Sequence, residues 1–423
     1  MINLDWDNIL IGDKKSILNK YEVKLKKIKN DLITKKSLGN DFLEWLDWPS
    51  KEFYEKDYKT MKNIQEKWIS MKIDTVVVIG IGGSSTGPKA GIDMLTEPFL
   101  KNNMNIIFVS GIHSVYNYSL LKELESKNWT LITISKSGTT FETSVNFRIF
   151  REKLFSIFGL KHNERIVAIT DQEKGVLKPL ADKKKYETLT IPNGIGGRYS
   201  SLTSVGLFPL LLAGINIDEV LKGWVDTINN FKNNPIENND PMIYAAIRYY
   251  LLTEKHKVIE VFNTYESNLS SIAEHYKQIF AESEGKTSNC LIPTIANHSE
   301  DLHSIGQLYQ DGNQSFFETT LTTLKVAREV IIPKSSFSDD DKLDYISKKT
   351  LKEMSSLIES AVKKAHNKIP NITIQLENCD PYNYGSIMAW LAIAAATGSL
   401  LLNVNPFNQP GVEAYKSEMK KLI

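Results

Sequence analysis

The chain has 423 residues, of which 42% are hydrophobic and 24% charged, so it is long enough to bury more than one hydrophobic core. Its formal net charge of +1 excludes the basic excess that attracts a protein to nucleic acid. Its two cysteines, Cys290 and Cys379, lie far apart in the sequence, which argues against a disulfide framework and predicts a reducing, cytoplasmic location.

The N-terminal part of the chain predicts a helix. Apolar side chains recur at helical spacing over residues 14–36, and lysines occupy the remaining face. We interpret this basic face as solvated, the alternative being a contact with nucleic acid. Residues 1–50 are therefore predicted to form a helical N-terminal segment.

A regular alternation of strands and helices starts near residue 75. Apolar, β-branched runs predict strands, and helical patterns separate most of them. The predicted strands are residues 75–79, 106–110, 131–135, 166–170 and 188–191. Such an alternation indicates a mainly parallel sheet with helices on both faces, whose ligands bind beyond the carboxyl ends of the strands. Residues 51–210 are therefore predicted to be a first α/β domain.

A second set of alternating elements follows a helical connection, predicted over residues 211–240. Its predicted strands are residues 258–262, 289–293, 329–333 and 372–376. We assign the second α/β domain to residues 241–400, and a C-terminal arm with a helix to residues 401–423. The most apolar run, residues 387–396, is about half as long as a membrane span requires, so it predicts a buried helix and no membrane partner.

Two loops that follow predicted strands are rich in glycine and hydroxyl groups. GIGGSSTGP, at residues 80–88, lacks the third glycine of a dinucleotide fingerprint and the lysine of a P-loop, which disfavours NAD and ATP. SKSGTTFET, at residues 135–143, combines a loop of four hydroxyls and Lys136 at residues 135–140 with the start of a helix. That combination suits a phosphate group, although a turn that only caps its helix is the alternative.

Several isolated polar residues acquire meaning only in combination. Arg198 follows paired glycines and can present a planar fork to an oxyanion. Glu282 and Glu284 are suitable bases for a carbon acid if one of them is partly desolvated. On their own, His303 predicts a structural histidine and Lys416 a surface lysine. The seven histidines show no metal-ligand spacing, so we expect no metal.

Taken together, these segments resemble the glucose-6-phosphate isomerase family, also called phosphoglucose isomerase, in its short bacterial form. Residues 80–88 and 135–143 look like the family's sugar-binding and phosphate loops, and GGRYSSLTSVGL at 196–207 and FNQPGVEAYK at 407–416 are similar to its two signatures. The resemblance runs from about residue 40 to the C-terminus, with all segments in the family's order. It implies two sugar-isomerase (SIS) domains that reversibly convert glucose 6-phosphate to fructose 6-phosphate, without metal or organic cofactor.

The resemblance also implies a role for individual residues. Glu282, in the ESxGK pattern, matches the base that moves a proton between C1 and C2 through a cis-enediolate, and Arg198 matches the arginine beside that enediolate. His303 matches the ring-opening histidine that the other subunit of a homodimer supplies, and Lys416 matches a lysine that assists at the ring oxygen. The implied substrate contacts are Gly83, Ser84, Ser135, Lys136, Ser137, Thr139, Thr140, Gln278 and Gln409.

The sequence departs from the family's pattern at a few positions. Ser137 stands where many members have threonine, Ser201 where an aliphatic residue or threonine is usual, and Glu284 where long forms carry asparagine. These changes keep every implied catalytic group but leave specificity open. One alternative is therefore a dual isomerase that also accepts mannose 6-phosphate, and another is a non-catalytic sugar-phosphate sensor on the same fold.

Overall fold

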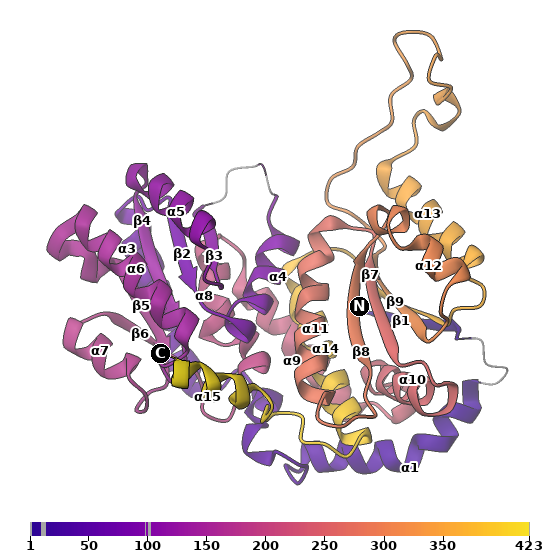
Figure 1. Cartoon of the computed structure of the whole chain (residues 1–423), viewed down its shortest axis with the longest axis horizontal. Coiled ribbons are helices and arrows are strands. Elements are labelled where there is room, and N and C mark those ends of the chain that lie inside the picture. Colours follow the sequence, from indigo (N-terminus) through magenta and orange to yellow (C-terminus); the bar gives the residue numbers. More distant parts are fainter. Residues whose placement is uncertain (1, 10–13, 98, 100–102, 423) are drawn as a thin grey trace.

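The computed structural model describes residues 2–9, 14–97, 99 and 103–422 of the chain. Two five-stranded sheets, each flanked by helices, lie beside each other (Figure 1). The predicted α/β architecture of two mainly parallel sheets is confirmed. Parts of the predicted terminal segments, residues 1, 10–13 and 423, lie outside the described residues.

The first sheet is entirely parallel and has the strand order β3-β2-β4-β5-β6. Its strands are β2 Thr75–Ile79, β3 Asn105–Val109, β4 Trp129–Ile134, β5 Ile166–Thr170 and β6 Glu187–Thr190. Its helices are α3 Lys59–Ser70, α4 Thr86–Leu95, α5 Ser114–Glu123, α6 Phe141–Phe158 and α7 Leu177–Lys184. The central strands β2, β4 and β5 are buried along their whole length, which explains their continuous apolar sequence.

The second sheet has the strand order β1-β10-β9-β7-β8. Its parallel strands are β7 Ile259–Thr264, β8 Ile292–Asn297, β9 Phe316–Thr323 and β10 Asn371–Leu376, and β1 Asn3–Asn8 joins the β10 edge antiparallel. Its helices are α10 Asp240–Lys255, α11 Ser270–Glu284, α12 Gly306–Asp311, α13 Leu351–Ala365 and α14 Pro381–Leu401.

Three predictions for this second sheet are wrong. Residues 329–333 form no strand; instead they belong to a projecting arm, residues 324–350, where Ile331 makes an isolated bridge to Thr350 (Figure 1). The strand lies earlier, at β9, and β8 begins three residues later than predicted. The N-terminal segment was predicted to be helical; it contains the helix α1 (Lys14–Ile33) but also contributes the strand β1. Its polar sequence fits an antiparallel edge strand, where burial alternates.

Helices join the two sheets into one body. α1 Lys14–Ile33 packs against α10 and α14, while α8 Ser204–Leu212 and α9 Ile217–Asn233 connect the two domains. α14 is long and apolar enough to cross a membrane by composition, but 94% of its 18-residue window is buried inside the protein. It packs against α9, α10 and α11. The predicted buried helix at residues 387–396 is therefore confirmed, and it forms the centre of the shared core.

Candidate active site

Four segments that are distant in sequence meet at the C-terminal end of α11, a helix that lies between the two sheets (Figure 1). They are the end of α11, the 3-10 turn Gly197–Leu202, the 3-10 turn Gly82–Ser84 and the C-terminal arm around residue 409. The two turns follow β6 and β2, respectively, so the segments gather at the carboxyl edge of the first sheet. This is where a parallel sheet presents its ligand-binding loops.

Glu282 is held between two donors near the end of α11. Arg198 Nη1 donates to Glu282 Oε2 over 3.0 Å, and Gln278 Nε2 donates to Glu282 Oε1 over 3.1 Å. The Arg198 side chain is 1% exposed, whereas that of Glu282 is 33% exposed. The carboxylate is therefore held by a buried arginine yet accessible to a ligand. Because both partners donate, it is presented as an acceptor, which is the state that a general base requires.

Arg198 connects three segments through its guanidinium. Besides Glu282, it contacts Ser283 Oγ through Nε over 2.8 Å, Gln409 Oε1 through Nη1 over 3.1 Å, and the carbonyl oxygen of Asn408 through Nη2 over 3.0 Å. The predicted residues Glu282, Arg198, Gln278 and Gln409 are thus brought together, and we call them the Glu282 cluster. A planar group with five donors suits this bridging position.

The glycine turn after β2 packs directly onto this cluster. A Cβ on Gly83 would lie 2.1 Å from the carbonyl oxygen of Gly197, so only glycine permits the two loops to touch. Ser84 ends the turn and is half-buried. Thr86 follows, and its hydroxyl donates to Gln278 Oε1 over 2.8 Å. That bond leaves the amide nitrogen of Gln278 to face Glu282.

Glu284 faces away from the site. It is buried, and Arg248 donates to both of its carboxylate oxygens, over 2.6 Å and 3.1 Å. Arg248 also donates to Glu260 Oε2 over 2.6 Å, which ties the end of α11 to α10 and β7. The two glutamates, which are two residues apart, therefore have different environments. Glu282 is open to a ligand, and Glu284 anchors the helix that carries Glu282.

The predicted phosphate loop lies between β4 and the start of α6. The Gly138 N–H donates to Ser135 Oγ over 3.0 Å, and the hydroxyls of Ser137 and Thr139 lie 2.8 Å apart. Thr140 precedes the first turn of α6. Hydroxyls and a helix N-terminus thus occupy one loop, a combination that suits a phosphate group.

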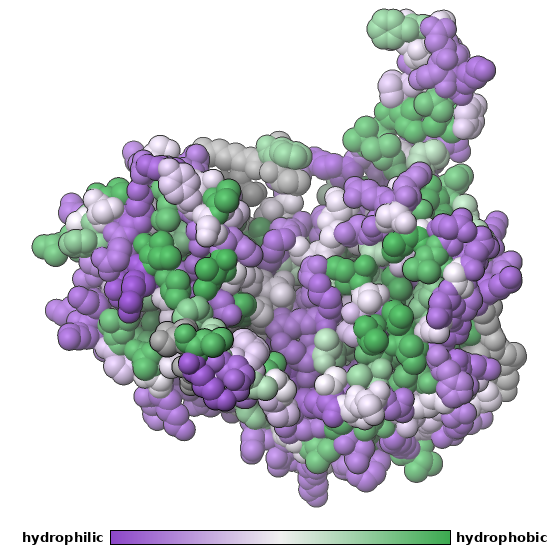
Figure 2. Space-filling view, viewed as in Figure 1, coloured by the Kyte–Doolittle hydropathy of each residue, from purple (hydrophilic) through white to green (hydrophobic). Residues whose placement is uncertain are grey.

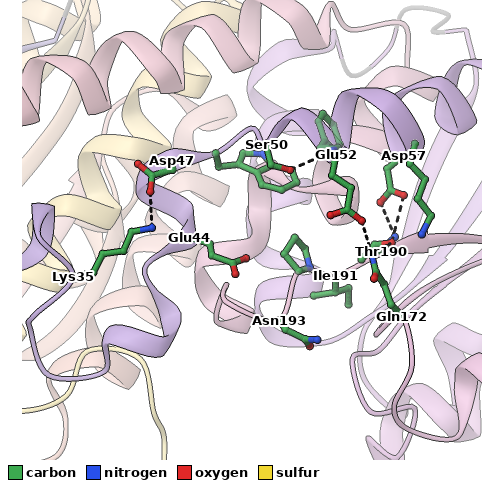
Figure 3. Close-up of a pocket in the computed structure, with 14 residues that line it drawn as sticks. Lys35, Glu44, Asp47, Ser50, Glu52, Asp57, Gln172, Thr190, Ile191 and Asn193 are labelled. Atoms are coloured by element: carbon green, nitrogen blue, oxygen red, sulfur yellow. Dashed lines mark hydrogen bonds and ion pairs between the residues drawn. The ribbon is translucent and has the colours of Figure 1, made fainter.

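Lys136 is directed toward the neighbouring loop after β6. Its Nζ donates to the carbonyl oxygen of Asn193 over 3.0 Å, and burial lowers the pKa of this lysine. The same loop continues to Arg198. Asn193 also lines a cavity of about 340 Å³ that the N-terminal segment closes from the other side. Glu44 and Asn193 extend toward the middle of this cavity (Figure 3), which is not lined by any member of the Glu282 cluster.

Two predicted catalytic residues are not part of the Glu282 cluster. His303 is exposed at the end of the short turn Glu300–His303, and Lys416 on α15 Val412–Leu422 pairs with Glu413 over 2.8 Å. No hydrogen bond or ion pair joins either residue to the cluster within the described part of the chain.

Sequence reasoning gave no role to three residues that support the cluster. Ser283 holds Arg198, Thr86 orients Gln278, and Lys286 donates to the carbonyl oxygens of Glu282 and Ser283. Ser283 and Lys286 stand inside the ESxGK pattern, so their closeness to Glu282 in sequence could have indicated that they support it. The Thr86 contact spans 192 positions and has no local signal.

The chain is similar in sequence and in fold to known proteins over most or all of its length. A family model described as phosphoglucose isomerase matches residues 55–340. The glucose-6-phosphate isomerase of Mycoplasmoides gallisepticum is 39% identical, with both chains covered completely, and that of Acholeplasma laidlawii is 41% identical over 93% of each chain. The crystal structure of a glucose-6-phosphate isomerase from Chlamydia trachomatis shares the fold, with a TM-score of 0.84 at 19% identity over 100% of this chain and 88% of that one.

Proposed function

This chain belongs to the phosphoglucose isomerase family and is a glucose-6-phosphate isomerase. We propose that Glu282, Arg198, His303 and Lys416 carry its reaction. The enzyme interconverts glucose 6-phosphate and fructose 6-phosphate, a step of glycolysis, and its two domains have the SIS fold. An activity of this kind sets aside the alternative of a non-catalytic sensor.

Glu282 is the proposed base. It takes the proton from C2 of the open-chain aldose and returns it to C1, so that the intermediate is a cis-enediolate. The observation that supports this role is the contrast in exposure: a carboxylate 33% exposed is oriented by an arginine that is 1% exposed. Arg198 is already positioned beside Glu282, so it offsets the negative charge that develops on the two substrate oxygens.

The loop from Ser135 to Thr140 is the proposed phosphate anchor. Its hydroxyls, Lys136 and the start of α6 provide donors and positive potential. Anchoring the phosphate converts binding free energy into orientation of C1 and C2 at Glu282. Gly83, Ser84, Gln278 and Gln409 are the proposed contacts to the sugar.

Ring opening requires an acid and a base near the ring oxygen and O1, and His303 and Lys416 are the proposed pair. His303 is exposed and away from the cluster of its own chain, which supports its delivery to the site of a second subunit. A homodimer is also supported by the projecting arm, residues 324–350. Val330, Phe337 and Tyr345 are 61–85% exposed there, and Figure 2 shows apolar surface on this projection.

Glu282→Gln tests the proposed base. The amide keeps the shape of the side chain but cannot accept the proton from C1 or C2, so kcat should fall by roughly 10²–10⁴-fold in either direction. The rate is measured in a coupled assay with fructose 6-phosphate. The matched control is Glu274→Gln, which removes an exposed carboxylate from the same helix and should leave turnover unchanged. Wild-type turnover by the Glu282→Gln enzyme contradicts the assignment.

A further inference from the structure

Lys286 closes the helix that carries Glu282. Its Nζ donates over 2.7 Å to the carbonyl oxygen of Glu282 and over 2.7 Å to that of Ser283. Both carbonyls belong to the last turn of α11, where backbone acceptors have no partner within the helix. A lysine placed there satisfies those acceptors and complements the negative end of the helix dipole.

The surroundings of Lys286 determine the charge on its ammonium group. It is only half-exposed, and among the described residues no ion pair within 4.0 Å joins it to a carboxylate. The charged groups that act on it are Glu282 and Glu284 of α11 and Arg198 of the turn Gly197–Leu202. Glu284 is itself neutralised by Arg248 of α10.

We propose that Lys286 is a positioning residue for Glu282, whose ammonium both fixes the last turn of α11 and supplies positive charge behind the reacting carboxylate. This inference rests on the proposed role of Glu282. In the resting enzyme, the ammonium lies 2.7 Å from the backbone carbonyl oxygen of Glu282 itself. When the enediolate forms, the ammonium adds to the field of Arg198 and lowers the energy of the developing anion.

The protonation of Lys286 gives this role a signature. Burial, followed by the charge of Arg198, lowers the pKa of Lys286 to about 7. Its charge is therefore present below neutral pH and absent at pH 9, while a neutral amine still has two hydrogens to donate to the two carbonyls. The geometry of the turn thus persists at high pH, and only the electrostatic contribution is lost.

The experiment measures kcat and KM from pH 5.5 to 9.5 for the wild type, Lys286→Arg and Lys286→Met. The wild-type kcat should decrease through a transition near pH 7, by about 3- to 10-fold, the scale of one partly screened charge several ångströms away. Lys286→Arg keeps the charge and should lack this transition. Lys286→Met should already have the lower kcat at pH 6. KM should change little, because Lys286 does not contact the phosphate loop.

The matched control is Lys24→Met. Lys24 also donates to the carbonyl oxygen at a helix end, Leu401 over 2.7 Å, and burial also lowers its pKa, but it lies on α1, away from the site. Its pH profile should follow the wild type. Ionisation of the substrate phosphate affects all four enzymes equally, so only differences between profiles are interpreted.

Identical kcat profiles for the wild type, Lys286→Arg and Lys286→Met overturn the proposal. If Lys286→Met does not fold, the comparison of Lys286→Arg with the wild type decides, since both retain the charge at pH 6 and only one retains it at pH 9. Failure of the proposed base is distinguishable: it appears as turnover by Glu282→Gln, whatever the Lys286 profiles show.

Discussion

At the scale of single residues, Arg198 determines the geometry of the proposed site. Its three nitrogens contact Glu282, Ser283, Gln409 and the backbone of the C-terminal arm. A lysine would supply one point charge and could not bridge these groups with a fixed orientation. Because the guanidinium is buried, solvent and salt screen its contacts much less than those of an exposed arginine. The proposed base is therefore pre-oriented before any ligand binds.

Lys136→Ala tests the phosphate anchor at the same scale. If Lys136 binds the phosphate in the ground state, its loss should raise KM for fructose 6-phosphate roughly 10- to 100-fold, the equivalent of one hydrogen bond to a charged group. A smaller decrease in kcat is expected, because phosphate binding also orients the reacting carbons. The measurement is steady-state kinetics together with the inhibition constant of a phosphorylated sugar acid.

Lys178→Ala is the control for that experiment. Lys178 lies on α7 of the same domain and its side chain pairs with Asp182, so its removal changes the net charge and leaves every side chain of the loop in place. It should leave KM and the inhibition constant unchanged. A phosphate role for Lys136 is ruled out if its alanine variant behaves in the same way as this control.

At the scale of elements, the packing of α11 against α4 includes a buried histidine, His275. His275 Nδ1 lies 3.2 Å from the hydroxyl of Thr86, and burial lowers the pKa of His275 to about 4. An unfolded histidine binds a proton near pH 6.5. Between pH 6.5 and 4 the unfolded chain thus binds more protons, so the free energy of unfolding should decrease as the pH falls through this window.

The free energy of unfolding should fall by roughly 3 kcal/mol over the whole window, because the pKa of His275 lies about 2.5 units lower in the folded chain than in the unfolded chain. His275→Gln cannot be protonated and should remove this part of the pH dependence, whereas His256→Gln, at an exposed helix end, should not. Denaturant unfolding at pH 7, 5.5 and 4.5 measures the difference. Equal slopes for the wild type and His275→Gln would mean that protonation of His275 does not contribute.

The elements themselves were predicted unevenly from the sequence, for physical reasons. The strands of the first sheet were located to within two residues, because strands covered on both faces are continuously apolar. β9, with the sequence FFETTLTT, was missed because half of its buried side chains are threonines. Val330, Ile331 and Ile332 are β-branched and apolar, yet they lie in the projecting arm, where the first two are each 61% exposed.

At the scale of the whole molecule, the sequence indicated which residues form the Glu282 cluster, but it did not indicate how they meet. Local motifs pointed to Glu282 and Arg198, and the structure joins them directly. The Thr86–Gln278 bond and the approach of Gly83 to Gly197 depend on how two distant segments pack, which no local pattern encodes. His303 stays outside the cluster of its own chain.

That position of His303 leads to a prediction for the assembled enzyme. If His303 opens the sugar ring, His303→Ala should slow turnover of the cyclic substrate far more than exchange of the C1/C2 proton in an open-chain analogue. The reason is that proton transfer by Glu282 begins only after the ring has opened. Comparing the two rates in one purified variant separates ring opening from proton transfer. Equal losses in both reactions would argue against this division of roles.

Mixing two inactive variants tests whether His303 serves the partner's site. In a symmetric dimer that exchanges one residue between its sites, a mixed dimer of Glu282→Gln and His303→Ala chains contains one site with both defects and one site with neither. Random subunit exchange makes about half of all dimers mixed, and each restores one of two sites, so recovery should approach roughly a quarter of wild-type activity. Exchange itself is followed by labelling the two chains. If His303 serves the partner's site, each mixed dimer has one site with an intact Glu282 and an intact His303, and that site must be active. If the labels mix and activity stays absent, His303 therefore acts in its own chain's site or has no catalytic role.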